Sequence, residues 1–141
     1  MGRIFCFFAT MKLLLKTEEA LQFALALALF QALPIGWGFM AALFLAPDLG
    51  MLGYLANPRI GAFTYNLLHH KGLALALYLI GFLLEHDWFQ FAGLLLFAHS
   101  AFDRALGYGL KYPDSFQHTH LGMIGRNPEV KATDASFEKV Q

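Results

Sequence analysis

Cysteine is almost absent from the 141-residue sequence, and charged residues are scarce. The lone Cys6 cannot form an internal disulfide, which excludes a disulfide framework and a cysteine-rich metal site. Any metal chemistry must therefore use histidine and carboxylate groups. Charged residues make up only 14% of the chain, whereas a soluble domain carries roughly a quarter. The formal net charge of zero gives no electrostatic signature of nucleic-acid binding, so we expect no nucleic-acid partner.

Hydrophobic residues make up 57% of the chain, which is too many for a soluble domain of this size to have a polar exterior. We therefore expect the lipid bilayer to be the main partner. A membrane span needs about twenty apolar residues, and four such runs predict helices at about 17–34, 37–56, 62–84 and 88–106. Short connections within the first and second pairs predict two antiparallel hairpins. The predicted fold class is all-α, an integral membrane bundle of about four transmembrane helices within a domain at 17–108.

The basic residues predict the orientation of this bundle. All ten lysines and arginines fall on one side of the predicted helices, so both termini should be cytoplasmic. The expected localisation is the cell (inner) membrane, with multiple spans. Residues 1–16 are then a cytoplasmic segment, 109–124 a cytoplasmic loop and 125–141 a solvated tail. The second methionine, Met11, suggests that residues 1–10 are a mis-called extension, and no secretory cleavage site is expected there.

Histidine and aspartate residues are predicted to gather at one depth of the bilayer. Trp37 and Trp88 mark the outer rim, where aromatic belts lie. Asp48 follows the first tryptophan, and His99 the second, by the same interval, which places both roughly 16 to 17 Å from that rim. Three more side chains fall about 6 Å further towards the cytoplasm: His69, His70 and Asp103.

This group contains candidate metal ligands and candidate catalytic residues. His99 and Asp103 stack one turn apart on a helix, so both could bind a metal ion, or Asp103 could orient His99. The metal-ligand candidates are His69, His70, His99 and Asp103, with His118 and His120 as weaker ones; the catalytic candidates are Asp48 and Asp103; the polar supports are Tyr65, Asn66 and Arg104. Arg104, together with Lys71 and Lys111, also fits a snorkelling anchor. Nitrogen and oxygen ligands without thiolate favour zinc, manganese or iron.

Three classes of function fit these residues. A metal-dependent hydrolase would direct an activated water at an ester or amide of a lipid-like or small amphipathic substrate. A proton- or ion-handling transport component would use Asp48 and the histidines as a relay, and four short helices would then require a homo-oligomer. A non-catalytic assembly or packing protein would use the same polar groups only to fix its helices.

Four sequence strings resemble a known bacterial membrane family: APDLGMLGY (46–54), GAFTYNLLHH (61–70), HSAFDRALGYGLKY (99–112) and THLG (119–122). They are similar to the family catalogued as domain of unknown function 4260, over about residues 11–122. The resemblance implies a small multi-pass membrane protein and no particular activity. The strings contain most of the candidate residues: Asp48, Asn66, His69, His70, His99, Asp103 and His120. A looser similarity of pattern links them to membrane-bound metal-dependent hydrolases.

Overall fold

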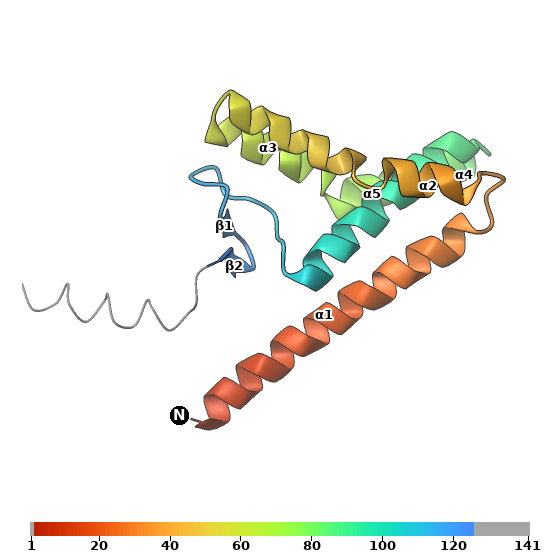
Figure 1. Cartoon of the computed structure of the whole chain (residues 1–141). Coiled ribbons are helices and arrows are strands. Elements are labelled where there is room, and N and C mark those ends of the chain that lie inside the picture. The colour runs from red at the N-terminus through yellow and green to blue at the C-terminus, as the bar shows by residue number, and fades with distance from the viewer. Residues whose placement is uncertain (1, 126–141) are drawn as a thin grey trace, which may run out of the picture.

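The computed structural model describes residues 2–125, and nearly all of its regular structure is helical (Figure 1). The prediction of an all-α fold is confirmed. The solvated tail predicted for 125–141 lies, from residue 126 onward, outside the described residues. The elements are, in chain order, α1 (Gly2–Phe30), α2 (Trp37–Leu43), the 3-10 helix η1 (Ala46–Leu55), α3 (Pro58–Leu68), α4 (Lys71–Leu83), α5 (Asp87–Leu106) and the two-residue strands β1 (His118–Thr119) and β2 (Gly122–Met123).

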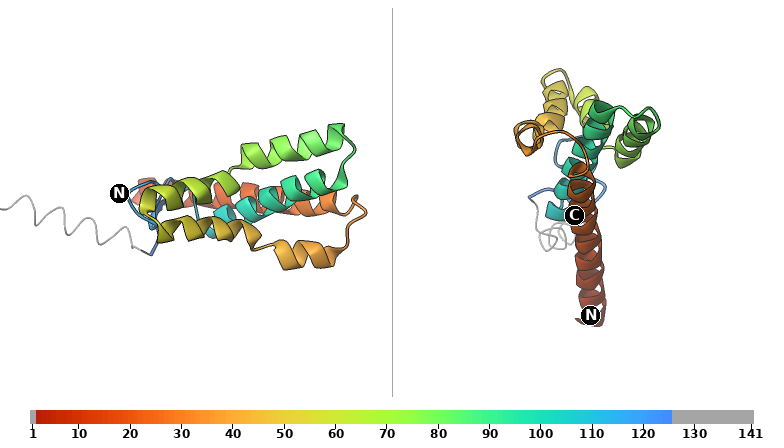
Figure 2. Two further views of the ribbon diagram at one scale, coloured as in Figure 1. Left: turned by 90° about the horizontal axis from the view of Figure 1, so that it is seen from above. Right: turned by 90° about the vertical axis from the view of Figure 1, so that its right-hand side faces the viewer.

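The helices form two packed units. Helix α5 is central to the first unit, with α1 and α4 packed along it, while in the second unit α3 packs along η1. We call the second unit the η1–α3 layer. Seen from above, the elements run side by side, with the connections at 31–36 and 84–86 at one end of the molecule (Figure 2, left). The η1–α3 connection and the segment at 107–124, which we call the strap, lie at the other end.

The apolar core lies between α1, α2 and α5, and α4 reaches it through a close helix crossing. A Cβ atom on Gly93 would overlap the backbone nitrogen of Tyr78, so this crossing between α5 and α4 requires glycine. The buried core residues are Ala26, Phe30, Met40, Phe91, Leu94, Leu95 and Ala98. Of the two predicted hairpins, the second is present as the packed pair α4–α5, whereas α1 packs mainly on α5 rather than on α2.

The structure corrects three of the predicted helix boundaries. Helix α1 begins at Gly2 instead of near residue 17. The helix predicted at 37–56 is divided into α2 and η1, because Pro47 at the start of η1 has no N–H to donate. The helix predicted at 62–84 is divided into α3 and α4, which are bent by 41° at a short break. At this break the His70 side chain accepts a hydrogen bond from Leu73 N and so caps the start of α4.

Within residues 2–125, one stretch is long and apolar enough to cross a membrane, Trp37–Leu55, and the bent α3–α4 pair is at most a second. Helices α1 and α5 do not meet the same criterion of length and composition. In α1, Lys16, Glu18 and Glu19 interrupt the apolar run. In α5, the mean hydropathy is lowered by polar side chains, among them His99 and Asp103.

Candidate metal centre

Four of the predicted site residues converge where the η1–α3 layer meets α5. Asp48 comes from η1 and His69 follows α3, whereas His99 and Asp103 lie on α5. One ligand atom from each lies within 4.8 Å of the corresponding atoms of the other three. The imidazoles of His69 and His99 are only 3% and 1% exposed, while the side chains of Asp103 and Asp48 are 16% and 30% exposed. The cluster is therefore buried at its nitrogen side and opens at Asp48.

The change from α2 to η1 orients His99. In a continuous α-helix the N–H of Asp48 would bond to the carbonyl of Phe44, but in η1 it donates to Leu45 O at 3.1 Å. The carbonyl of Phe44 is thereby available to a side chain. His99 Nδ1 lies 2.8 Å from this oxygen. The Phe44 ring also packs edge-on against the imidazole, with centroids 5.3 Å apart.

The end of α3 orients His69 in a similar way. Its Nδ1 lies 2.8 Å from the carbonyl oxygen of Tyr65, one turn earlier, and the Tyr65 ring stacks on the imidazole with centroids 3.7 Å apart. A carbonyl oxygen only accepts hydrogen bonds, so the proton of each neutral imidazole must sit on Nδ1. Both Nε2 atoms are then left with lone pairs, and they face each other at 3.0 Å. A backbone carbonyl bound to the far nitrogen is typical of metal-binding histidines.

The spacing of the four ligand atoms fits a tetrahedral metal ion. The Asp48 oxygen lies 3.5 Å from His69 Nε2 and 3.3 Å from His99 Nε2, and the Asp103 oxygen lies 3.4 Å and 3.8 Å from the same two atoms. An ideal tetrahedron with metal–ligand distances of about 2.0 to 2.1 Å has edges of about 3.3 to 3.4 Å. These four edges and the 3.0 Å separation of the two Nε2 atoms lie near this value, and all four ligand atoms lie within 4.8 Å of one another.

The three predicted polar supports all contact the cluster or the elements that hold it. The Tyr65 hydroxyl donates to Asp103 Oδ2 at 3.0 Å, which fixes that carboxylate. Arg104 donates to the carbonyl oxygen of His69 at 3.4 Å. Asn66 holds the strap through the backbone of Lys111, since its amide donates to Lys111 O at 2.8 Å and accepts from Lys111 N at 2.6 Å.

Lys111 is a site residue that the sequence placed only among the interfacial anchors. It is 4% exposed, and its Nζ lies 3.8 Å from the centre of the Phe116 ring and 5.1 Å from that of Tyr65. Burial lowers the pKa of this ammonium group, and the negative charges of Asp103 and Asp48 oppose that shift. The strap therefore brings one cation within electrostatic range of the two carboxylates. No local sequence signal could have found it, because its position depends on how the strap folds.

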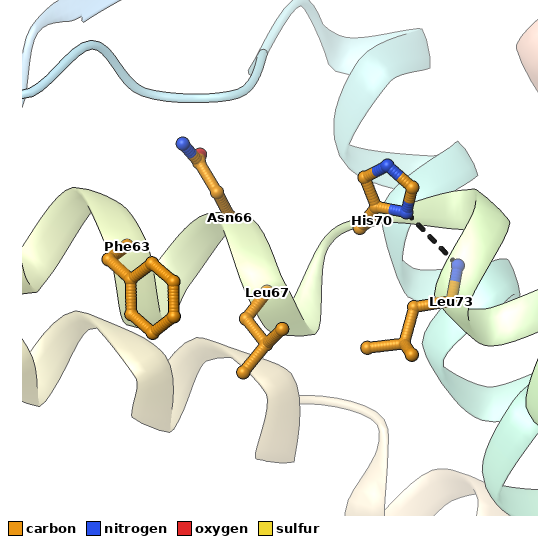
Figure 3. A pocket seen from close by; sticks show the side chains of 5 residues that line it. All are labelled: Phe63, Asn66, Leu67, His70 and Leu73. Carbon is orange, nitrogen blue, oxygen red and sulfur yellow. Dashed lines mark hydrogen bonds between the residues drawn. The ribbon is translucent and has the colours of Figure 1, made fainter.

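Three predicted candidates lie elsewhere. His70 is exposed and caps α4 at the edge of an apolar groove of about 480 Å³ that also includes Phe63 and Leu67 (Figure 3). His118 Nδ1 lies 2.7 Å from Asp114 Oδ2, in a hydrogen-bonded contact on the strap. His120 Nδ1 accepts a hydrogen bond from Leu110 N at 2.8 Å. None of the three shares the cluster of Asp48, His69, His99 and Asp103.

The comparisons with known proteins place the chain in a family. No curated protein and no solved structure matches it. The family described as Domain of unknown function (DUF4260) matches residues 12–124, a region that includes all four residues of the cluster together with Tyr65, Asn66 and Lys111. Because this match covers most of the chain, the protein belongs to the DUF4260 family.

Proposed function

We propose that Asp48, His69, His99 and Asp103 bind a divalent metal ion, and that the protein is a membrane-embedded, metal-dependent enzyme of the hydrolase type. One observation carries the proposal: the two imidazole Nε2 atoms face each other at 3.0 Å, while both Nδ1 atoms lie 2.8 Å from backbone carbonyl oxygens. With the proton of each neutral ring on Nδ1, neither ring can donate to the other, and both carboxylates are acceptors as well. A cation at the centre satisfies all four groups.

The donor set restricts the metal and suggests a role for each residue. Two imidazoles and two carboxylates without thiolate fit zinc, manganese or iron(II). His69, His99 and Asp103 are the more buried ligands, whereas Asp48 is the most exposed and is the ligand that a water molecule would displace. Once displaced, the Asp48 carboxylate would be suited to act as a general base. A metal ion held by the other three residues would lower the pKa of that water toward 7 and so support hydrolysis of an ester or amide. Lys111 supplies positive charge beside this site.

Membrane residence is the second part of the proposal. Large apolar side chains are exposed along the molecule, including Leu21 at 71%, Leu83 at 77% and Leu55 at 86%. Monomeric soluble proteins rarely expose contiguous apolar surface on this scale. The apolar stretch Trp37–Leu55 carries Asp48, so the cluster would lie within the bilayer and near its basic, cytoplasmic side. A lipid-like or small amphipathic substrate could then reach it from the membrane.

Two adjacent histidines provide a matched test of metal binding. The full chain is purified in a mild detergent, incubated with zinc, manganese or iron(II), desalted and analysed for metal content. We expect about one ion per chain in the unmodified protein and in His70→Asn, which keeps an N-cap for α4. His69→Gln should lose the ion. Absence of bound metal in the unmodified protein, or equal loss in both variants, would refute the proposal.

A proton-handling transport component is the second candidate, because a proton shared between His69 Nε2 and His99 Nε2 also relieves the contact at 3.0 Å. The two candidate functions predict different results for metal content and for proton flux. Under the proton-handling function, no ion copurifies, and reconstituted vesicles should acidify under a membrane potential. His99→Gln should abolish that flux, whereas His70→Asn should leave it unchanged. A metal-bound chain without proton flux supports the enzyme instead.

A further inference from the structure

A second polar site lies where the first half of α1 meets the end of α5 and the strap. It is a cavity of about 490 Å³, within the range of small-molecule sites, and its lining includes Lys12, Lys16, Arg104 and His120. Lys12 and Lys16 are one turn apart on α1, so both point from the same face of the helix. Arg104 reaches the cavity from α5, and His120 reaches it from the strap.

The charges in this cavity are unbalanced. Its one carboxylate, Glu19, forms an ion pair with Lys71, so it does not neutralise the basic side chains. Like charges at i and i+4 repel one another on a helix, and Arg104 adds a third cation from the other wall. An anion in the cavity would relieve this repulsion.

His120 adds a neutral donor to the three cations. Its Nδ1 accepts the N–H of Leu110 at 2.8 Å, so the ring proton must sit on Nε2. That nitrogen can therefore donate a hydrogen bond without the ring being charged. Leu15 and Leu121 supply an apolar wall to the same cavity. Cationic groups, a hydrogen-bond donor and apolar surface suit an anionic group attached to an acyl chain.

We propose that this cavity binds a terminal phosphate group, either as the phosphate monoester of a lipid headgroup or as free inorganic phosphate. Basic pockets between helices on the cytoplasmic side of a membrane bind such headgroups. The proposal rests on α1, α5 and the strap and does not require a metal ion in the cluster. It would add an anion-binding function to the chain whether or not the cluster of Asp48, His69, His99 and Asp103 binds metal.

Calorimetric titration of the full chain in a neutral detergent tests this site. The protein is first treated with a chelator and dialysed, so that phosphate cannot bind to a metal ion. The probes are inorganic phosphate, dioctanoyl phosphatidic acid and, as a control, dioctanoyl phosphatidylcholine. We expect saturable binding of phosphatidic acid and little binding of phosphatidylcholine. Competition by inorganic phosphate would identify a free anion as a ligand, whereas binding of phosphatidic acid alone would identify a lipid headgroup.

Two exposed basic residues provide the matched variants. Lys16→Gln should weaken binding of phosphatidic acid about fivefold, since one cation near an anionic headgroup contributes about that factor. The double variant Lys12→Gln/Lys16→Gln should weaken binding further. Arg59→Gln removes the same charge from the exposed start of α3, outside the cavity, and should leave binding unchanged. Equal effects of Lys16→Gln and Arg59→Gln, or no saturable binding, would overturn the proposal.

Discussion

Removing the metal ion should loosen the η1–α3 layer selectively. Two of the four proposed ligands, Asp48 and His69, belong to this layer, and the other two belong to α5. Helix α3 packs mainly on η1, whereas α5 packs on α1 and α4. A bound ion would therefore join the two packed units at their boundary. Local unfolding of the η1–α3 layer would separate the proposed ligands, whereas local unfolding of the distant end of α4 would leave them together.

The size of the effect follows from mass action. An ion that binds only the closed form slows exchange through opening by a factor of 1 + [M]/Kd, where [M] is the free metal concentration. At a free metal concentration about 1,000-fold above Kd, opening becomes about 10³-fold rarer, equivalent to about 4.1 kcal/mol. Amides of residues 46–68 should therefore exchange up to about 10³-fold faster after chelation.

Hydrogen–deuterium exchange of the detergent-solubilised chain, with and without metal, measures this effect peptide by peptide. Peptides from the α4 half of the α4–α5 hairpin serve as an internal control and should change little. His69→Gln is the second control, since its exchange should not respond to metal. A uniform change along the chain, or a response of equal size in His69→Gln, would refute the idea that the ion joins the η1–α3 layer to α5.

Three further predictions concern the helix crossing, the strap and the hydrogen bond between His118 and Asp114. Gly93→Ala should lower the free energy of unfolding by about 1–3 kcal/mol, because the added Cβ would overlap the Tyr78 backbone. The added Cβ of Gly38→Ala meets no atom within 4 Å, so this control variant should not lower the free energy of unfolding. Thermal unfolding of the two variants and the unmodified protein measures the difference. Asn66→Ala should lower the free energy of unfolding by about 1–3 kcal/mol and speed proteolysis of the strap, since it leaves the Lys111 backbone N–H and carbonyl without their side-chain partner. Equal rates of proteolysis in Asn66→Ala and the unmodified protein would contradict this. The hydrogen bond from His118 holds the pKa of Asp114 below its ordinary value of 3.8, so the stabilisation that the Asp114 carboxylate gives is present above that pH and is lost as the pH falls through the lowered pKa. The His118 ring resonances should follow this loss, and in Asp114→Asn they should not.

Hydropathy predicted the helical class of the chain but not its interruptions. The apolar runs around α2–η1 and α3–α4 each read as one helix, because hydropathy does not register a missing hydrogen bond. The sequence shows Pro47, but it does not show which backbone carbonyl is left without a helical hydrogen bond or which side chain binds that carbonyl. Here the available carbonyl belongs to Phe44 and its partner is His99, 55 residues further along the chain.

The gathering of four candidate residues was predictable from the sequence, but the details of the site were not. Helical rise placed Asp48, His69, His99 and Asp103 at similar depths, and the structure brings these four together. The same reasoning could not separate His69 from His70, since neighbours in a continuous helix share a depth. The break after α3 separates them, so that His69 is buried in the cluster and His70 is exposed.

Hydrogen-bond roles distinguish a metal site from a cluster that only fixes helix packing. Polar packing contacts between helices pair a donor with an acceptor. At the centre of this cluster the converging atoms are two imidazole Nε2 atoms and two carboxylate oxygens, and the donor that contacts them is the Tyr65 hydroxyl, bound to Asp103. One proton can bridge only one pair of these atoms. A divalent ion would accept electron pairs from all four, and this is the reason for which we propose metal binding instead of a purely structural role.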